Sequence, residues 1–324
     1  MDTITTHVSE FITAHLTGPS LAWYLYVIIC ILVLSRCRVV NCVLCWLPLI
    51  LTVLYFTVRN DLDKGINSTT FFEGFTAGGN IGDTKDAPEN SMAALKLALE
   101  SKNVVMFDVR LASDGKAVVI KDETTNRTMK RSLIVADNPS NSLTNLTSLS
   151  SSERIPLLKS VLDECREKDA KVVIRTHESS AALLSEISDY VKKYQLYTKV
   201  VVTSGLPTVS FYMKRHDKNM LTGITYSRHG AVHYYQKTHP KSLFFKLLGQ
   251  LIDDSMQVLM RSLLLPRFIG TEVIFVSYKD VSENFANDVT AQKMHLVAYD
   301  VNEKNEQERL HDISVPYFTP VLKA

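Results

Sequence analysis

A run of short motifs between Phe75 and Thr128 decides the fold of this chain. Glycines and turn-forming residues alternate in it with apolar, β-prone runs, which predicts strands and helices in quick succession. The motifs are, in order, Phe75-Thr76-Ala77-Gly78-Gly79, Ala87-Pro88-Glu89-Asn90, Met106-Phe107-Asp108-Val109, Asp114-Gly115, Lys121-Asp122 and Asn126-Arg127-Thr128.

The same alternation continues from Thr70 to the end of the chain. Helices are expected at Met92–Lys102, with Asn90 as its N-cap, and at Leu157–Lys168 and Ala181–Lys193. An added hairpin strand, Ala117–Lys121, follows the Asp114-Gly115 turn. Eight strands alternating with helices over about 250 residues is the pattern of a (β/α)8 TIM barrel. The eight are expected at Phe71–Ala77, Val104–Leu111, Lys171–His177, Lys199–Thr203, Met220–Tyr226, Glu272–Val276, Leu296–Asp300 and Val315–Thr319.

The motifs resemble those of the glycerophosphodiester phosphodiesterase family, in particular its membrane-anchored animal branch. In that family the run reads roughly His-Arg-Gly-Gly, Pro-Glu-Asn, Glu-x-Asp, Asp-Gly and His-Asp. The resemblance covers residues 70–320 and implies a TIM barrel of the phospholipase-C-like phosphodiesterase type. It also implies a chemistry at the C-terminal mouth of the barrel. There a divalent cation is held by carboxylates of the second and third strands, two histidines move protons, and an arginine grips phosphate.

Most of the residues that carry this chemistry are replaced here. Thr76 and Ala77 stand at the first histidine and the arginine, and Lys121 stands at the second histidine. Threonine exchanges no proton near neutral pH, alanine grips no anion, and lysine has an ordinary pKa of about 10.4. The Thr-Asp pair that the family carries near its C-terminus is replaced by Thr319-Pro320. The resemblance therefore indicates the fold more strongly than the activity.

The expected metal ligands are also reduced. Met106 replaces the glutamate of Glu-x-Asp and Asp108 is the one ligand kept, while Arg175 stands where the third strand should supply a carboxylate. Mg²⁺ and Ca²⁺ prefer several oxygen ligands, so no metal and no other cofactor is expected. We expect Asp108 and Arg175 to form an ion pair in place of the metal. Mg²⁺ or Ca²⁺ is expected as a cofactor only if the protein is an active hydrolase.

The other residues of the motifs have ordinary structural explanations. Gly78, Gly79 and Gly115 allow backbone conformations that other residues avoid, and Pro88-Glu89-Asn90 suits the start of a helix. A histidine on a barrel strand, His177, is more often a hydrogen-bonded core residue than a catalyst. The histidines of the long loop are too scattered for a zinc site; they are His229, His233 and His239.

The N-terminal part has the composition of a membrane anchor. Residues 1–20 are polar, and residues 21–58 hold an apolar run, Arg36-Cys37-Arg38 and a second apolar run, 39–58, long enough to span a bilayer. One span or a tight hairpin is compatible with this pattern. In both cases the arginines favour the cytoplasmic side, so the barrel, residues 65–324, is expected on the lumenal or extracellular side of an endomembrane or the plasma membrane.

The cysteines and the sequons agree with that topology. Of five cysteines only Cys165 lies in the barrel, so no disulfide can form within it. The N-terminal four are read as small apolar residues or as palmitoylation sites. Sequons begin at Asn67, Asn126 and Asn145, of which Asn67 and Asn145 are the preferred glycosylation sites.

The loop between the fifth and sixth parallel strands is unusually long. We expect a helical insertion at 228–270, centred on a helix at Lys241–Leu265. Its apolar face is wide enough either to pack on the barrel or to lie in a membrane interface. Its charges argue against a true span. The narrow polar stripe consists of Ser242, Lys246, Gln250, Asp253, Gln257 and Arg261.

Three functions remain for such a chain. The first is a catalytically inactive, membrane-anchored, phosphodiesterase-like protein of lipid metabolism that binds the phosphate head group of a lysophospholipid or glycerophosphodiester. The second is an active metal-dependent hydrolase of those compounds, and the third is a membrane scaffold for a protein partner. A net charge of +2 does not suggest nucleic-acid binding. The expected ligand-binding residues are Glu89, Asp108, Lys121, Arg175 and His177.

Overall fold

The computed structural model describes residues 46, 50–51, 53–61, 66–82, 84 and 86–320. Contacts divide the chain into two compact units, residues 1–59 and 60–324. In the first unit residues 53–58 are helical, and most of the expected membrane segment lies outside the described residues. Among the helices that are described, none combines the length and the apolar character needed to cross a bilayer.

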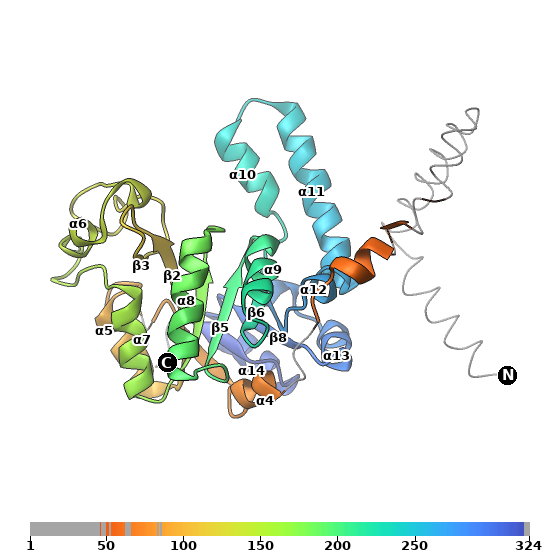
Figure 1. Cartoon of the computed structure of the whole chain (residues 1–324), viewed down its shortest axis with the longest axis horizontal. Helices are drawn as coiled ribbons and strands as arrows, with labels where there is room; N and C mark the ends of the chain where they lie inside the picture. Colours follow the sequence, from red (N-terminus) through yellow and green to blue (C-terminus); the bar gives the residue numbers. More distant parts are fainter. Residues whose placement is uncertain are drawn as a thin grey trace. The chain divides into compact units, whose positions relative to one another are not determined.

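The second unit is a closed barrel of eight parallel strands, as the alternating sequence pattern predicts (Figure 1). Going round the sheet the order is β1-β9-β8-β7-β6-β5-β4-β2, and pairing of β1 with β2 closes it. β3 (Ala117–Val119) is an added antiparallel partner of β2. The parallel strands are β1 Ala77–Asn80, β2 Val104–Leu111, β4 Lys171–Thr176, β5 Val200–Ser204, β6 Leu221–Tyr226, β7 Val273–Ser277, β8 His295–Tyr299 and β9 Tyr317–Thr319.

Helices follow most strands and cover the outside of the barrel. Their facing sides are apolar: α8, for example, buries Leu183, Ile187 and Val191 against the sheet. The sequence predicts the bounds of three of these helices to within one residue at each end. The covering helices are α5 Met92–Ser101, α7 Leu158–Glu167, α8 Ala181–Tyr194, α9 Pro207–His216, α13 Glu283–Ala291 and α14 Lys304–Asp312. Shorter turns are α6 Ser140–Thr144, η1 Val135–Asp137 and η2 Tyr278–Asp280.

The inside of the barrel is filled by side chains rather than hollow. Phe275 and Phe318 are buried at its centre, and two strand glycines make room for their rings. A Cβ atom at Gly78 would lie 2.6 Å from the Phe318 ring, and one at Gly223 would lie 2.5 Å from the Phe275 ring. Both distances are far inside van der Waals contact, so the aromatic core depends on glycine at these two positions.

One strand and one cap are predicted wrongly. The strand expected at Phe71–Ala77 is instead the end of helix α4 (Ile66–Phe72) followed by a turn, and β1 starts only at Ala77. Phe71 is fully buried below the barrel, where its ring contacts Phe75 edge-on. The aromatic residues that suggest a strand therefore form an apolar plug. Likewise Ser91, not Asn90, caps α5 by accepting from the Ala94 N–H.

The long segment between β6 and β7 folds as three helices. α10 (Gly230–Thr238) and α11 (Leu243–Arg261) lie side by side as an antiparallel pair and extend beyond the barrel (Figure 1). α12 (Leu264–Ile269) leads back into β7. The C-terminal part of α11 packs on the barrel wall, where Met260 is buried in the outer core.

The free energy of unfolding should depend on pH through His295, which packs against the apolar plug. The ring of His295 stacks on Phe72 with centroids 4.0 Å apart, and burial lowers the pKa of His295 to about 4 from 6.5. The unfolded chain binds this proton more readily, so the group lowers stability as pH falls from 6.5 towards 4. Replacing His295 by Phe keeps a stacked ring without the titration. The free energy of urea unfolding should then fall less steeply with pH in the variant, and equal slopes in both proteins would count against this role.

Candidate functional site

Two neighbouring strands place an aspartate and an arginine opposite each other at the C-terminal mouth of the barrel. On β2 the alternation of side chains turns Val104, Met106 and then Asp108 inward. The register of β2 with β4 sets Asp108 directly beside Arg175. Asp108 is fully buried and Arg175 is 8% exposed. Burial of this kind requires that each charge have a partner.

The ion pair expected between Asp108 and Arg175 is confirmed. Arg175 Nε donates to Asp108 Oδ1 at 2.5 Å, and Nη2 donates to Oδ2 at 3.0 Å. His177 Nε2 also lies 2.7 Å from Oδ1, and Asn90 Nδ2 donates to Oδ2 at 3.4 Å. Two-point binding of a carboxylate by the guanidinium is the geometry in which such pairs are strongest. Both oxygens of the retained aspartate are therefore occupied by nitrogen donors.

The electrostatics of this cluster keep it charged. Burial raises the pKa of Asp108, but the hydrogen bond from His177 and the charge of Arg175 outweigh it, so the pKa lies well below its usual value. Burial lowers the pKa of Arg175, and the Asp108 carboxylate more than reverses this. The aspartate is thus an anion throughout the physiological range, balanced by its own guanidinium.

Asn90 is a member of this cluster that the sequence analysis treats only as a helix cap. Its Oδ1 accepts the Asp108 backbone N–H at 3.0 Å while its amide reaches the carboxylate. Its φ angle of 54° lies in the left-handed region, which asparagine tolerates better than most residues. The Pro-Glu-Asn turn therefore has a function beyond starting α5, because it holds Asp108 in place.

The first strand brings a different residue to the mouth from the one expected. Thr76 precedes β1 and Ala77 opens it, so both lie at the N-terminal end of the barrel, away from Asp108. Their assignment to the catalytic histidine and arginine positions is wrong. Asn80 ends the strand, and Ile81 follows it. Neither an amide nor an aliphatic side chain replaces the missing proton carrier or phosphate-binding cation.

Asn80 is itself nearly buried, at 4% exposure. Its Nδ2 donates to Asp300 Oδ1 at 2.9 Å. The Asn80 Oδ1 atom is buried and accepts no hydrogen bond from any residue that the structure describes. A buried acceptor without a donor is costly to the folded state.

Two further cations stand near the mouth. Lys121 follows β3 and is exposed, and its backbone oxygen accepts a 2.8 Å hydrogen bond from Arg110 Nε. This bond ties the end of β2 to the loop after β3.

Met106, at the position of the missing glutamate, is 1% exposed and belongs to the apolar core. It offers no oxygen to a cation.

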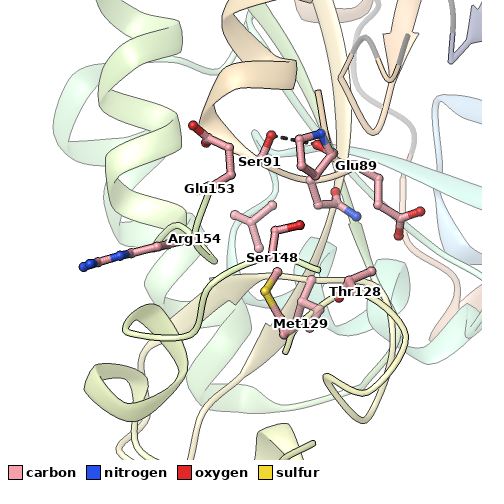
Figure 2. Close-up of a pocket in the computed structure, with 11 residues that line it drawn as sticks. Glu89, Ser91, Thr128, Met129, Ser148, Glu153 and Arg154 are labelled. Carbon is pink, nitrogen blue, oxygen red and sulfur yellow. Dashed lines mark hydrogen bonds between the residues drawn. The ribbon is translucent and has the colours of Figure 1, made fainter. Parts of the chain in front are cut away.

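Glu89 does not join Asp108. It forms a two-point ion pair with Arg127, at 2.9 and 2.5 Å, and Arg127 Nε also contacts Asp122. Beside it lies a small pocket, with Ser91 on one side and Met129 on the other (Figure 2). The cavity measures about 10 Å³, which is about what one water molecule needs. Glu89 therefore has a structural partner, and the adjoining space does not fit an organic ligand.

The residues of the mouth do not fit the cation that the family resemblance implies. In the described part of the chain no three Asp, Glu, His or Cys side chains converge as metal ligands. The positions expected to supply oxygens hold Met106 and Arg175, and the oxygens of Asp108 are already bound. A guanidinium at the ligand position repels a divalent cation and supplies no lone pair.

Comparison with known proteins establishes the class to which this barrel belongs. Residues 82–317 match the glycerophosphoryl diester phosphodiesterase family, so the chain is a member of that family. The glycerophosphodiester phosphodiesterase 1 of Mus musculus is 28% identical over 247 residues, which are 70% of this chain and 72% of that protein. The Homo sapiens protein of the same name is 25% identical over 244 residues, covering 70% and 71%.

Solved structures agree on the fold. A phosphodiesterase of Oleispira antarctica, in complex with the product sn-glycerol-3-phosphate, has a TM-score of 0.57 at 16% identity and covers 77% of this chain and 94% of its own. A glycerophosphodiester phosphodiesterase of Agrobacterium tumefaciens has a TM-score of 0.61 at 16% identity, covering 76% and 97%. At these identities the likeness concerns the fold alone.

Breaking the buried pair should be far more costly than breaking an exposed one. Arg175→Met leaves the buried Asp108 carboxylate without its guanidinium and should lower the free energy of unfolding by about 3–5 kcal/mol. The matched control is Arg127→Met, which removes the exposed ion pair with Glu89 and should cost less than about 1 kcal/mol. The double variant Asp108→Leu, Arg175→Met should recover much of the loss. Equal costs for the two single variants, measured by urea unfolding, would contradict a buried pair.

Proposed function

We propose that this chain is a catalytically inactive member of the glycerophosphodiester phosphodiesterase family, one that binds a phosphate-bearing ligand at its barrel mouth without hydrolysing it. The ligand class is the phosphate head group of a lysophospholipid or glycerophosphodiester, by analogy with the family. The observation that carries the proposal is the two-point pairing of Arg175 with Asp108.

The case for inactivity rests on the residues at each step of the reaction. Hydrolysis of a phosphodiester in this family needs polarisation of the phosphoryl oxygen by a cation and a proton carrier on either side. The cation would have to compete with Arg175 for its one retained ligand. Asn80 ends the first strand at the mouth and Lys121 stands at the position of the family's second histidine, and neither side chain is an imidazole that could carry the proton.

The case for binding rests on what the mouth still offers. Arg175 uses Nε and Nη2 on Asp108, which leaves Nη1 for another acceptor. His177, 29% exposed in its side chain, and the exposed Lys121 add donors near the same opening. The buried Asn80 Oδ1 has no hydrogen-bond donor among the described residues. An anionic group that also carries a hydroxyl satisfies both demands, as phosphorylated glycerol does.

The proposal includes a location. The apolar residues 21–58 favour attachment to a membrane, with Arg36 and Arg38 on the cytoplasmic side and the barrel in the lumen or outside the cell. Exposure supports two of the three sequons as usable in that compartment. Asn126 and Asn145 are exposed, whereas Asn67 is half-buried in α4 with its Nδ2 donating to Asn219 O at 3.4 Å.

Hydrolysis and binding can be separated in one set of assays. The full chain, purified in detergent, should not hydrolyse glycerophosphocholine or lysophosphatidylcholine with either Mg²⁺ or Ca²⁺. It should bind glycerophosphocholine in calorimetry, and Lys121→Glu should weaken that binding about tenfold, since a hydrogen bond to a charged group contributes about 1.5–3 kcal/mol. The control Lys192→Glu, at the opposite end of the barrel on α8, should have no effect. Metal-dependent turnover would establish the enzyme instead, and no binding at all would leave the scaffold function.

Topology predicts which asparagines carry glycans. If the barrel is lumenal, the protein expressed in animal cells should lose gel mobility through glycans at Asn126 and Asn145. Replacing both by Gln should remove most of the shift that an endoglycosidase reverses, while replacing Asn67 should change little because its amide nitrogen is already engaged. A mobility that the enzyme leaves unchanged, together with protease access only from the cytosol, would place the barrel on the other side.

A further inference from the structure

The α10–α11 pair, residues 230–261, is built as a rigid hairpin. Asp253, only 7% exposed, turns back from α11 and accepts the N–H groups of Ala231 and Val232 at 2.9 Å each. It thereby caps the start of α10. Gly249 lets the helices approach closely, because a Cβ there would lie 2.9 Å from the Val232 Cα. The hairpin therefore holds a fixed shape beyond the barrel wall.

The far half of this hairpin leaves large apolar side chains in solvent. Leu243 and Phe244 are each 68% exposed, and Leu247 and Leu251 are each 55% exposed. These residues follow one another at helical spacing on α11, and Tyr234 of α10 is 62% exposed. Isolated exposed apolar residues are common, but a row of this kind on one projecting element marks an interaction surface.

The charges from Arg228 to Ile252, the stretch that holds this row, have one sign. From Arg228 to Ile252 the chain has four basic residues, three histidines and no Asp or Glu. The three lysines of this stretch, Lys237, Lys241 and Lys246, are exposed. Of the two carboxylates that follow, Asp253 is turned inward to cap α10, whereas Asp254 is exposed. Exposed apolar side chains surrounded by lysines complement the interface of a bilayer with negatively charged head groups.

We infer that the hairpin docks on an anionic lipid surface, with Phe244, Leu247 and Leu251 inserted among the lipids and the lysines on the head groups. α10 starts four residues after the C-terminal end of β6, so the hairpin leaves the barrel at the same end as Asp108 and Arg175. Docking therefore turns the barrel mouth towards the membrane. The hairpin lies in the interface and does not span the bilayer.

Local protection in the full chain tests this inference, because the N-terminal residues respond separately. Amide hydrogen exchange is followed in peptides covering 243–251, with the protein in vesicles of phosphatidylcholine alone or with phosphatidylserine. Exchange should slow in the anionic vesicles. Each lysine near an anionic surface contributes about fivefold to binding, so Lys237→Glu, Lys241→Glu and Lys246→Glu together should abolish the protection.

Two matched variants make the result specific. The charge control reverses Lys168, Lys192 and Lys218, three exposed lysines near the opposite end of the barrel, and should keep the protection. Phe244→Ser, Leu247→Ser and Leu251→Ser together should remove it without lowering the melting temperature, since these side chains are already exposed.

Two outcomes would overturn the inference. Protection that is the same in neutral and anionic vesicles would mean that the lysines recognise no lipid charge. Protection that disappears in nanodiscs holding a single copy would identify a second copy of this chain as the partner. Glycerophosphocholine binding by these variants is expected to stay unchanged, so a failure here is distinct from a failure of the proposed ligand-binding function.

Discussion

The buried ion pair of Asp108 with Arg175 is the interaction on which the mouth of this barrel depends. A carboxylate buried at this depth is unstable without a counter-charge, and a cation bound by several oxygens is one way to supply it. Here the strand next in the sheet supplies a guanidinium, at a register position directly opposite. The two solutions exclude each other, because both use the same oxygens of Asp108. The pair is therefore the observation on which the proposed loss of the family's metal chemistry rests.

The surrounding structure is consistent with retention of the site for another purpose. Asn90 and His177 complete the hydrogen bonds of Asp108, so the cluster is fully formed. Asn80 donates its amide N–H to Asp300 and leaves its buried Oδ1 without a donor among the described residues. The basic, apolar hairpin leaves the barrel at this same end. A mouth that binds a head group and a hairpin that docks on lipid would thus act on one surface.

The sequence predicts the barrel well because its periodic signals are local. The alternation in Val104–Leu111 and the amphipathic pattern of α8 are set by neighbouring residues, and the structure reproduces both. The Asp108–Arg175 pair was predictable too, since the motifs fix their strands and burial demands a partner. Phe71 and Thr76 show the limit. An aromatic run such as the one that contains Phe71 is compatible with a strand or with an apolar plug. The pairing of β1 with β9, which starts at Ala77, leaves Phe71 outside the sheet.

The misplaced first strand also explains what the sequence could not show at the mouth. Matching Gly78-Gly79 to the glycines of the family motif assigns Thr76 to the mouth, but β1 spans Ala77–Asn80, so Asn80 and not Thr76 lies at that end of the barrel. Asn90 is missed for a different reason: its contact with Asp108 joins residues 18 apart through a left-handed turn. Exposure of the hairpin likewise depends on tertiary packing, since the same apolar face on the barrel wall would be buried.

The most direct test of the central claim is a crystal structure of the protein soaked in Mn²⁺, with anomalous scattering used to locate the metal. The account predicts that both oxygens of Asp108 stay hydrogen-bonded to Arg175, with no anomalous peak within coordination distance of the carboxylate. A peak bound to Asp108, with the guanidinium of Arg175 displaced, would contradict it.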